Sequence, residues 1–356
     1  MRQNGKIMMV GPNIDGLGGI SRVVRIWRDG SVFSDNEVKY ISTVTDRGVN
    51  KGLYLLKAFA SFVGSILKGQ PLVYIHTSSY NSFRRKSVFL AAGLMFRRKI
   101  VLHIHPTHFH QFVLELKGIE RALTHFLLNR VDGLVVLTEE MRASMDSLFH
   151  GRPVYVLRNP VDVSSMKNSD GWEREHRRLL YLGWYIREKG VYDLVDAIEI
   201  LILRGTTVFL DLFGTKQVKE LRTYVKRKQL EGAVSVHEWI DDREKCKALH
   251  RATALVLPSY SEGMPNVILE AMATRTPIIS TQVGGLKEVL RDGENAIITK
   301  AGDPTDLSEK ILRCLNDAEL RNRIAANAYE EALAKYDVSI VKKELSRILR
   351  QLPTPS

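Results

Sequence analysis

Two glutamates separated by seven residues, Glu262 and Glu270, stand in the stretch that is richest in side chains able to do chemistry. That stretch reads Pro258-Ser-Tyr-Ser-Glu-Gly-Met-Pro-Asn-Val-Ile-Leu-Glu-Ala-Met-Ala. A carboxylate at position 270 could accept hydrogen bonds from vicinal hydroxyls, such as those of a ribose. A carboxylate at position 262 could reach a second hydroxylated group beyond a phosphate. The alternative is a capped helix that carries two solvated acids.

A helix that begins at Pro265 would complete this candidate site. Proline suits the first helical position because its missing N–H has no partner to lose there. The first backbone N–H groups of a helix lack intrahelical partners and carry the positive end of the helix dipole. The amides of Asn266 and Val267 therefore form a candidate site for a phosphate group.

A second candidate lies near the start of the chain, where Gly16, Gly18 and Gly19 follow the first apolar run. Glycine lets a backbone approach a ligand closely, and a following helix would offer free N–H groups to a phosphate. The dinucleotide-binding spacing is not met, because Ser21 stands where its third glycine would be. A plain tight turn is the alternative.

Four histidines, His103, His105, His108 and His110, follow one another closely. In a strand, the first two would share one face. A metal site is disfavoured, because no cysteine is near and no Asp or Glu stands between residues 102 and 113. We expect His103 to be buried in the strand.

The segment from Glu262 to Ala273 resembles the signature of retaining glycosyltransferases of the GT-B fold, family 4. Other segments that resemble this family are Pro277-Ile-Ile-Ser-Thr-Gln-Val-Gly-Gly-Leu-Lys-Glu, Asp292-Gly-Glu-Asn, Tyr181-Leu-Gly-Trp-Tyr-Ile-Arg-Glu-Lys-Gly, Gly18-Gly19 and Leu102-His-Ile-His105. The resemblance spans nearly the whole chain. It implies the transfer of a sugar from a nucleoside diphosphate to a hydroxyl.

The resemblance also implies roles for particular residues. Glu270 would bind the nucleotide ribose, Glu262 would approach the transferred sugar, and Lys189 would neutralise the diphosphate. Trp184 replaces an arginine of the family pattern. We expect Arg187 to substitute for it, since guanidinium suits phosphate oxygens.

The expected catalytic set is His105, Lys189 and Glu262, with His105 bonded to the transferred sugar. The expected donor-binding residues are Gly18, Gly19, Arg187, Gly214, Asn266, Val267 and Glu270. The chain contains no D-x-D motif, which transferases of the other major fold use to hold a divalent cation. We therefore expect no metal and no other cofactor.

Short apolar runs alternate with helical patterns along the chain, which predicts parallel sheets covered by helices on both faces. The predicted fold class is α/β, a GT-B fold of two doubly wound Rossmann-like domains that face each other across a cleft. Ligands are expected in that cleft, outside the carboxyl ends of the strands. Residues 108–129 and 305–336 are each predicted as one continuous helix.

A polar stretch at residues 160–172 breaks the alternation and predicts a domain junction. Residues 1–165 would form an acceptor-binding domain, and residues 166–336 would form a domain that binds the nucleotide sugar. The resemblance implies that residues 337–356 form a helix that packs back on the first domain.

The chain of 356 residues has a formal net charge of +12. The excess lies in residues 1–165, which carry 22 basic and 12 acidic residues. It suits nucleic acid, an anionic membrane or a phosphorylated substrate. Zinc-finger spacing and RNA-binding aromatic patterns are absent, so we expect no nucleic-acid partner.

Two basic triplets, Arg84-Arg85-Lys86 and Arg97-Arg98-Lys99, flank an apolar run and predict a lip that rests on anionic lipid. An ordinary helix with solvated charged ends is the alternative. Only two cysteines are present, and the start of the chain lacks a signal-peptide pattern. We expect a cytoplasmic protein, peripheral at the inner face of the cell membrane.

The resemblance, together with these patterns, implies a retaining, metal-independent glycosyltransferase, with a UDP-sugar favoured as donor and GDP-mannose next. The acceptor would be a glycan linked to polyprenyl diphosphate, in the synthesis of a capsule, an exopolysaccharide or an O-antigen. The alternatives are a sugar-nucleotide epimerase of the same fold and a non-catalytic partner subunit, which Trp184 favours.

Overall fold

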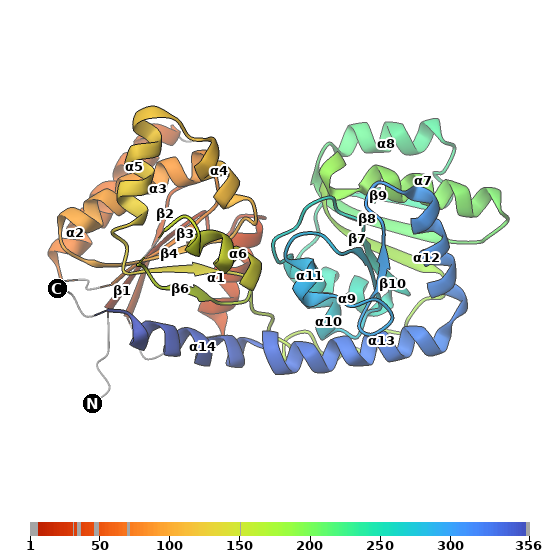
Figure 1. The fold of residues 1–356 in the computed structure, drawn as a ribbon. Helices are drawn as coiled ribbons and strands as arrows, with labels where there is room; N and C mark the ends of the chain where they lie inside the picture. Colours follow the sequence, from red (N-terminus) through yellow and green to blue (C-terminus); the bar gives the residue numbers. More distant parts are fainter. Residues whose placement is uncertain are drawn as a thin grey trace. The chain divides into compact units, whose positions relative to one another are not determined.

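The computed structural model describes residues 6–30, 32–33, 37–45, 50–69, 72–149 and 151–353. The chain divides into two compact units (Figure 1). The first consists of Met1–Pro160 together with Val338–Ser356, and the second consists of Val161–Asp337. The sequence placed these boundaries at residues 165 and 336, close to where the units divide.

The first unit contains a parallel sheet of six strands in the order β2-β1-β3-β4-β5-β6. The strands are β1 (Lys6–Gly11), β2 (Glu37–Ser42), β3 (Leu72–Thr77), β4 (Lys99–Ile104), β5 (Gly133–Val136) and β6 (Val154–Val156). The helices are α1 (Gly19–Asp29), α2 (Lys51–Leu67), α3 (Asn81–Met95), α4 (Phe109–Glu115), α5 (Gly118–Leu128), α6 (Glu139–Asp146) and α14 (Val338–Gln351). The strand order reverses between β1 and β3, and the carboxyl ends of strands at such a point bind ligands in doubly wound sheets.

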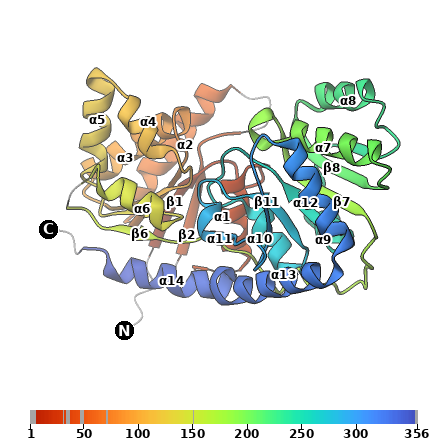
Figure 2. The ribbon, with the colours of Figure 1, turned by 45° about the vertical axis from the view of Figure 1, so that its right-hand side comes forward.

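Helix α14 belongs to the first unit although it ends the chain (Figures 1 and 2). Its apolar residues Val341, Leu345 and Ile348 recur at helical spacing and are all buried. They share one hydrophobic core with Trp27 of α1 and Tyr74 of β3. Burial of this apolar stripe fixes α14 to the first unit.

The second unit contains a parallel sheet in the order β12-β11-β10-β7-β8-β9. The strands are β7 (Arg178–Tyr185), β8 (Phe209–Lys216), β9 (Val234–His237), β10 (Ala254–Leu257), β11 (Ile278–Thr281) and β12 (Ile297–Thr299). The helices are α7 (Val191–Leu203), α8 (Val218–Arg227), α9 (Asp242–Arg251), α10 (Asn266–Ala273), α11 (Leu286–Val289), α12 (Pro304–Asn316) and α13 (Ala318–Glu331). A 3₁₀ turn η1 (Arg187–Lys189) follows β7, and a π-helical turn η2 (Ala332–Tyr336) follows α13. The order reverses between β7 and β10, so the loops after these two strands meet.

Two helices predicted as continuous are each divided. The prediction for residues 305–336 was wrong at Asp317, whose carboxylate accepts the Leu320 amide and starts α13 as a new helix. The prediction for residues 108–129 was wrong at Leu116, where extended backbone separates α4 from α5. No helix among the described residues is long and apolar enough to span a bilayer.

Candidate functional site

The loop after β10, residues 258–265, is fixed by backbone hydrogen bonds on both sides. The Tyr260 amide donates to the Glu188 carbonyl at 2.9 Å, and the Gly285 amide donates to the Glu262 carbonyl at 3.0 Å. The first bond joins the loop to the turn after β7, and the second joins it to the start of α11. The position of Glu262 is therefore set by both neighbouring segments.

Lys189 reaches this loop because the turn η1 passes very close to Pro258. The turn ends at Gly190, which has φ +67°, and a Cβ there would lie 2.0 Å from the Pro258 carbonyl oxygen. Only glycine allows both the conformation and the approach. The loops after β7 and β10 thus meet closely at the switch point of the sheet.

An ion pair joins the two predicted catalytic residues of the second unit. Lys189 Nζ lies 2.7 Å from Glu262 Oε1, and the Ser259 hydroxyl donates to the same oxygen at 2.7 Å. The Glu262 side chain is 7% exposed and that of Lys189 is 23% exposed. Nearby, burial and secondarily the Glu262 charge raise the pKa of Tyr181 well above its ordinary value. The pair is accessible from the lysine side.

A second, more deeply buried ion pair holds the other glutamate of the motif. Lys245 Nζ of α9 lies 2.7 Å from Glu270 Oε1 of α10, and both side chains are at most 5% exposed. Asp242 Oδ1 lies 3.1 Å from the same lysine nitrogen. Each glutamate of the motif therefore pairs with a lysine from a different segment.

Helix α10 begins between Glu262 and Glu270 in the sequence. Pro265 is the N-cap rather than the first helical residue, so the predicted position was one residue early. The Ile268 amide donates to the Pro265 carbonyl at 3.1 Å. Asn266 and Val267 open the helix, where the positive end of its dipole favours an anion. That Asn266 and Val267 bind the nucleotide-sugar donor stays a prediction.

Gly214 and Arg187, which are also predicted to bind the nucleotide-sugar donor, make contacts within the protein. Gly214 pairs with Gly183, whose carbonyl oxygen would lie 2.0 Å from a Cβ at position 214, so strand packing alone requires this glycine. The Arg187 guanidinium lies 5.3 Å from the ring centre of Tyr192. Trp184 is 41% exposed, with Lys216 Nζ over its ring. Roles for Gly214 and Arg187 in donor binding stay predictions.

The glycine loop of the first unit ends where α1 begins. The Ser21 hydroxyl and the Gly16 amide both donate to the Asn13 carbonyl, which fixes the loop. Gly18 has φ −82°, and the nearest atom to a Cβ there would be Ser21 Oγ at 3.9 Å. The local structure therefore has room for a side chain at position 18. Close approach of a ligand is a remaining reason for glycine at this position. Gly19 is the first residue of α1.

His105 belongs to a buried cluster whose key partner the sequence reasoning missed. His105 Nε2 and His76 Nδ1 lie 3.0 Å apart, and the Tyr74 hydroxyl lies 3.1 Å from His103 Nδ1. His103 is buried, as predicted. Burial and secondarily Lys86 lower the pKa of His105 to about 3, and burial lowers the pKa of His76 and His103 as well. His105 is therefore a neutral hydrogen-bonding group near neutral pH.

We tested whether this cluster fits a metal ion. One nitrogen of each of His76, His103 and His105 lies within 4.8 Å of the others, and Nε2 of His76 and of His103 has no partner among the described residues. However, the His103 and His105 rings are stacked with only 23° between their planes. Imidazole lone pairs lie in the ring plane, so these two cannot converge on one ion without rotation. The absence of a metal role stays a prediction.

The prediction that the two basic triplets form an exposed lip is wrong for Lys86. This side chain is 1% exposed, its ammonium donates to Ser82 Oγ at 2.8 Å, and burial lowers its pKa to about 7. Arg84 forms an ion pair with Glu120 of α5. Lys86 lies on the buried face of α3 with Phe83 and Phe89, so the first triplet does not present three cations to solvent.

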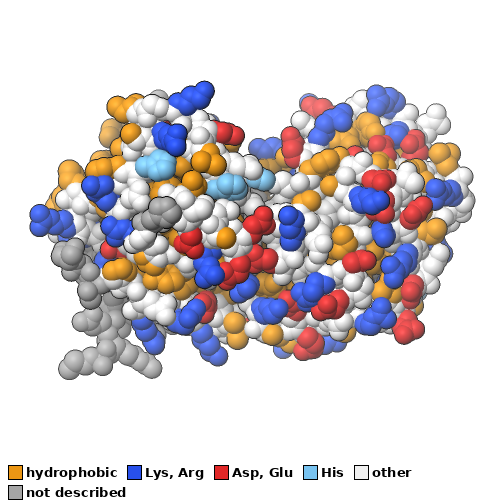
Figure 3. All heavy atoms as spheres, in the orientation of Figure 1, with side chains coloured by type: hydrophobic (Ala, Val, Ile, Leu, Met, Phe, Trp, Pro, Cys, Tyr) orange, Lys and Arg blue, Asp and Glu red, His pale blue; other side chains and the backbone are white. Residues whose placement is uncertain are grey.

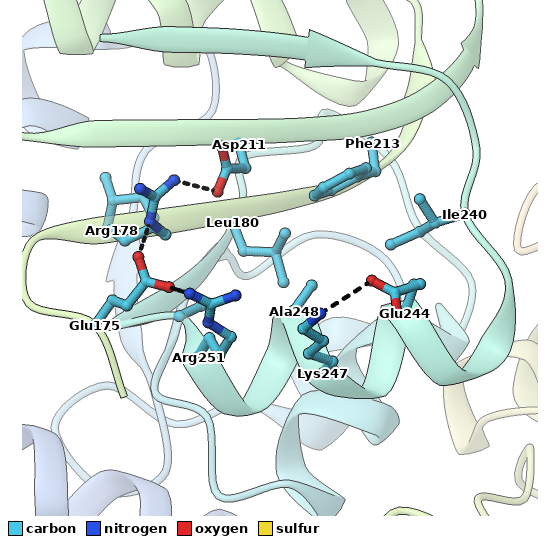
Figure 4. Close-up of a pocket in the computed structure, with 12 residues that line it drawn as sticks. Glu175, Arg178, Leu180, Asp211, Phe213, Ile240, Glu244, Lys247, Ala248 and Arg251 are labelled. Atoms are coloured by element: carbon cyan, nitrogen blue, oxygen red, sulfur yellow. Dashed lines mark hydrogen bonds and ion pairs between the residues drawn. The ribbon is translucent and has the colours of Figure 1, made fainter. Parts of the chain in front are cut away.

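A cavity of about 270 Å³ lies elsewhere in the second unit, between α9 and strands β7 and β8 (Figure 4). Arg178 contacts Glu175 and Asp211 there, and Arg251 also contacts Glu175. None of the predicted site residues lines this cavity. Its charged groups already pair with one another, so we place the candidate site at the loops after β7 and β10.

Comparisons with known proteins agree with this architecture. Residues 162–331 match the family model described as glycosyl transferases group 1. Phosphatidyl-myo-inositol mannosyltransferase of Mycobacterium leprae is 29% identical over 292 residues, which cover 80% of this chain and 74% of that protein. A capsular polysaccharide biosynthesis glycosyltransferase of Staphylococcus aureus, CapM, is 27% identical over 168 residues, 46% of this chain and 43% of that protein.

Among solved structures, Anabaena Alr3699/HepE in complex with UDP and glucose has a TM-score of 0.78 and 19% identity, covering 98% of this chain and 100% of that chain. The two parallel sheets with their helices therefore have the GT-B fold. The family model matches nearly all of the second unit, and the sequence relatives are glycosyltransferases, so the chain is a glycosyltransferase.

Sequence reasoning missed Lys245, Ser259 and His76. Lys245 had a signal, because it shares a buried helix face with Cys246 and Leu249. His76 also had a signal, because it is the penultimate residue of an apolar strand, as His103 is of the next strand, and the two are paired in register. Ser259 had no sequence signal beyond its place three residues before Glu262.

The histidine cluster predicts how the free energy of unfolding depends on pH. Unfolded histidine takes up a proton below about pH 6.5, whereas folded His105, with its pKa of about 3, does not. Its stabilising contribution is thus present above pH 6.5 and is lost as the pH falls toward 3. Urea titrations at pH 7.5 and 5.5 should show that His105→Gln loses less stability than the wild type over this interval, by on the order of 1 kcal/mol. Equal losses in both proteins would contradict a neutral, buried His105.

Proposed function

We propose that the chain transfers a sugar, with retention of its anomeric configuration, from a nucleoside diphosphate to a hydroxyl of a glycan acceptor. The observation that carries this proposal is the pairing of Lys189 with Glu262 where the loops after β7 and β10 meet. It puts a cation and a carboxylate at the edge of the sheet where ligands bind in doubly wound folds.

The leaving diphosphate gains negative charge in the transition state, so its stabilisation is the main task of the site. We assign that task to Lys189 and to the first amides of α10, which act as fixed positive groups. Lys189 would exchange Glu262 for a phosphate oxygen when the donor binds. These groups would do the work of a metal ion, so the reaction needs no divalent cation.

Glu262, released from Lys189, would accept hydrogen bonds from hydroxyls of the transferred sugar. Glu270 would bind the ribose, and His105 of the first unit would bond to the sugar as a neutral group. We assign no protein nucleophile. The acceptor hydroxyl attacks from the face that the diphosphate leaves, and a leaving phosphate oxygen takes its proton.

We favour a UDP-sugar as donor, with GDP-mannose as the second choice. The HepE structure contains UDP and glucose, and a relative from Mycobacterium leprae is a mannosyltransferase. The names of two relatives support the acceptor: one acts in capsular polysaccharide biosynthesis, and the other acts on phosphatidyl-myo-inositol. We propose a lipid-linked glycan of a cell-surface polysaccharide.

An exposed apolar stripe on α5 supports contact with the membrane that would carry such an acceptor. Ile119, Leu123 and Phe126 recur at helical spacing and are 88%, 52% and 49% exposed. Lys117, Arg121 and Arg130 accompany them in the sequence. Figure 3 shows apolar and basic side chains together over the upper part of the first unit. We propose that this stripe, rather than the triplet that contains Lys86, contacts an anionic lipid surface on the cytoplasmic side.

Two substitutions separate the roles of the glutamates. Glu270→Ala should raise the dissociation constant of the nucleotide about tenfold or more, because a charged hydrogen bond to the ribose contributes about 1.5–3 kcal/mol. Glu262→Ala should mainly lower kcat, because its contacts strengthen toward the transition state. Nucleotide titrations and turnover of radiolabelled UDP-sugars and GDP-mannose, run in EDTA, measure both effects. Equal loss of nucleotide affinity in the two variants, or turnover that requires added Mg²⁺, would refute the assignment.

The membrane surface predicts sedimentation with lipid. Wild-type protein should pellet with phosphatidylglycerol vesicles at low salt and be released at high salt, because salt screens charges. Replacing Ile119, Leu123 and Phe126 by serine should release it at low salt, since each buried side chain contributes about 1.5–3 kcal/mol. Leu203→Ser, at an apolar position of the second unit that is 81% exposed, is the control and should still pellet. Wild-type protein that stays in the supernatant at low salt would exclude this surface.

A further inference from the structure

Lys245 is a long cation on a buried helix face. It lies on α9 beside Cys246 and Leu249, and only 4% of the residue is exposed. Its neighbour Lys247 on the same helix is 35% exposed and pairs loosely with Glu244 at 3.6 Å (Figure 4). Burying an ammonium group is costly unless a close counter-charge compensates. A buried lysine at position 245 therefore needs an explanation that the more exposed Lys247 does not need.

The compensation comes from Glu270, whose carboxylate oxygen Oε1 lies 2.7 Å from Lys245 Nζ. Buried ion pairs are often no more stabilising than well-packed apolar residues of similar size. Stability alone therefore does not explain a lysine here. An ion pair, unlike an apolar pair, holds a carboxylate in a fixed orientation.

The orientation of Glu270 is constrained at three points. Its backbone carbonyl accepts the Thr274 hydroxyl at 3.0 Å, which ties down the main chain of α10. Its Oε1 is held by Lys245, and Lys245 is held from its other side by Asp242 at 3.1 Å. A terminal carboxylate otherwise rotates broadly about its last torsion. The lysine thus fixes which way the second oxygen, Oε2, points.

We propose that Lys245 is a positioning residue that orients the Glu270 carboxylate toward the ribose hydroxyls of the nucleotide. The inference rests on the proposed ribose contact of Glu270. Lys245 itself touches no substrate, and it acts through the carboxylate that it holds. It should therefore affect nucleotide affinity only through the ribose hydroxyls.

The test compares nucleotides with and without those hydroxyls. Dissociation constants are measured by calorimetry for UDP and for 2′,3′-dideoxy-UDP, or for the guanosine pair if GDP binds better. The proteins are the wild type, Lys245→Met, Lys245→Gln, Lys245→Arg and the control Lys247→Met. Lys245→Gln keeps a hydrogen-bond donor in place of the charge, and it serves if Lys245→Met does not fold. Melting temperatures identify the folded variants.

We expect the wild type and Lys247→Met to bind UDP at least about tenfold more tightly than the dideoxy analogue. Lys245→Met should lose most of that preference while its affinity for the analogue stays within about twofold. Lys245→Gln should lose part of it and Lys245→Arg should restore it. Among kinetic constants, KM for the donor should rise more than kcat falls.

Four other outcomes are decisive. A preference that survives in both Lys245→Met and Lys245→Gln overturns the positioning role. An equal loss of affinity for both ligands overturns it too, because a general structural defect would then explain the result. A wild type that does not distinguish the two ligands refutes the ribose contact of Glu270 itself, and a wild type that binds neither nucleotide refutes the proposed function.

Discussion

The second unit depends on one constraint, that a buried charge must have a close partner of opposite sign. Glu262 and Glu270 lie in the same short segment, and each meets this requirement with a lysine from another element. Lys189 comes from the turn after β7, and Lys245 comes from α9. The two pairs fix the segment against its neighbours.

The two pairs differ in exposure, and this difference divides their roles. Lys189 is the more exposed lysine, and we propose that an incoming diphosphate draws it away from Glu262. Lys245 is enclosed, and we propose that its contact with Glu270 persists while a ligand binds. In the first unit, burial keeps His105 uncharged, and Gly18 offers a backbone without a side chain.

The sequence predicted the parallel sheets because buried strands that alternate with amphipathic helices leave a strong periodic signal. It also predicted the loop and helix around Glu262 and Glu270, to within one residue at Pro265. It failed where a charge is buried. Lys86 was read as part of a solvent-exposed triplet, although its spacing from Phe83 and Phe89 places it on the buried face of α3. Lys245 was overlooked because its partner lies 25 residues away, and pairing across such a separation has no local pattern.

Nucleotide affinity measures the proposed exchange of Lys189 between Glu262 and a diphosphate. Uridine, UMP and UDP, or the guanosine series, are titrated in EDTA into the wild type and into Lys189→Met. The wild type should gain affinity from UMP to UDP, and Lys189→Met should lose most of that gain while binding uridine equally well. A Lys189→Met variant that keeps the full gain from UMP to UDP would show that Lys189 does not bind the diphosphate.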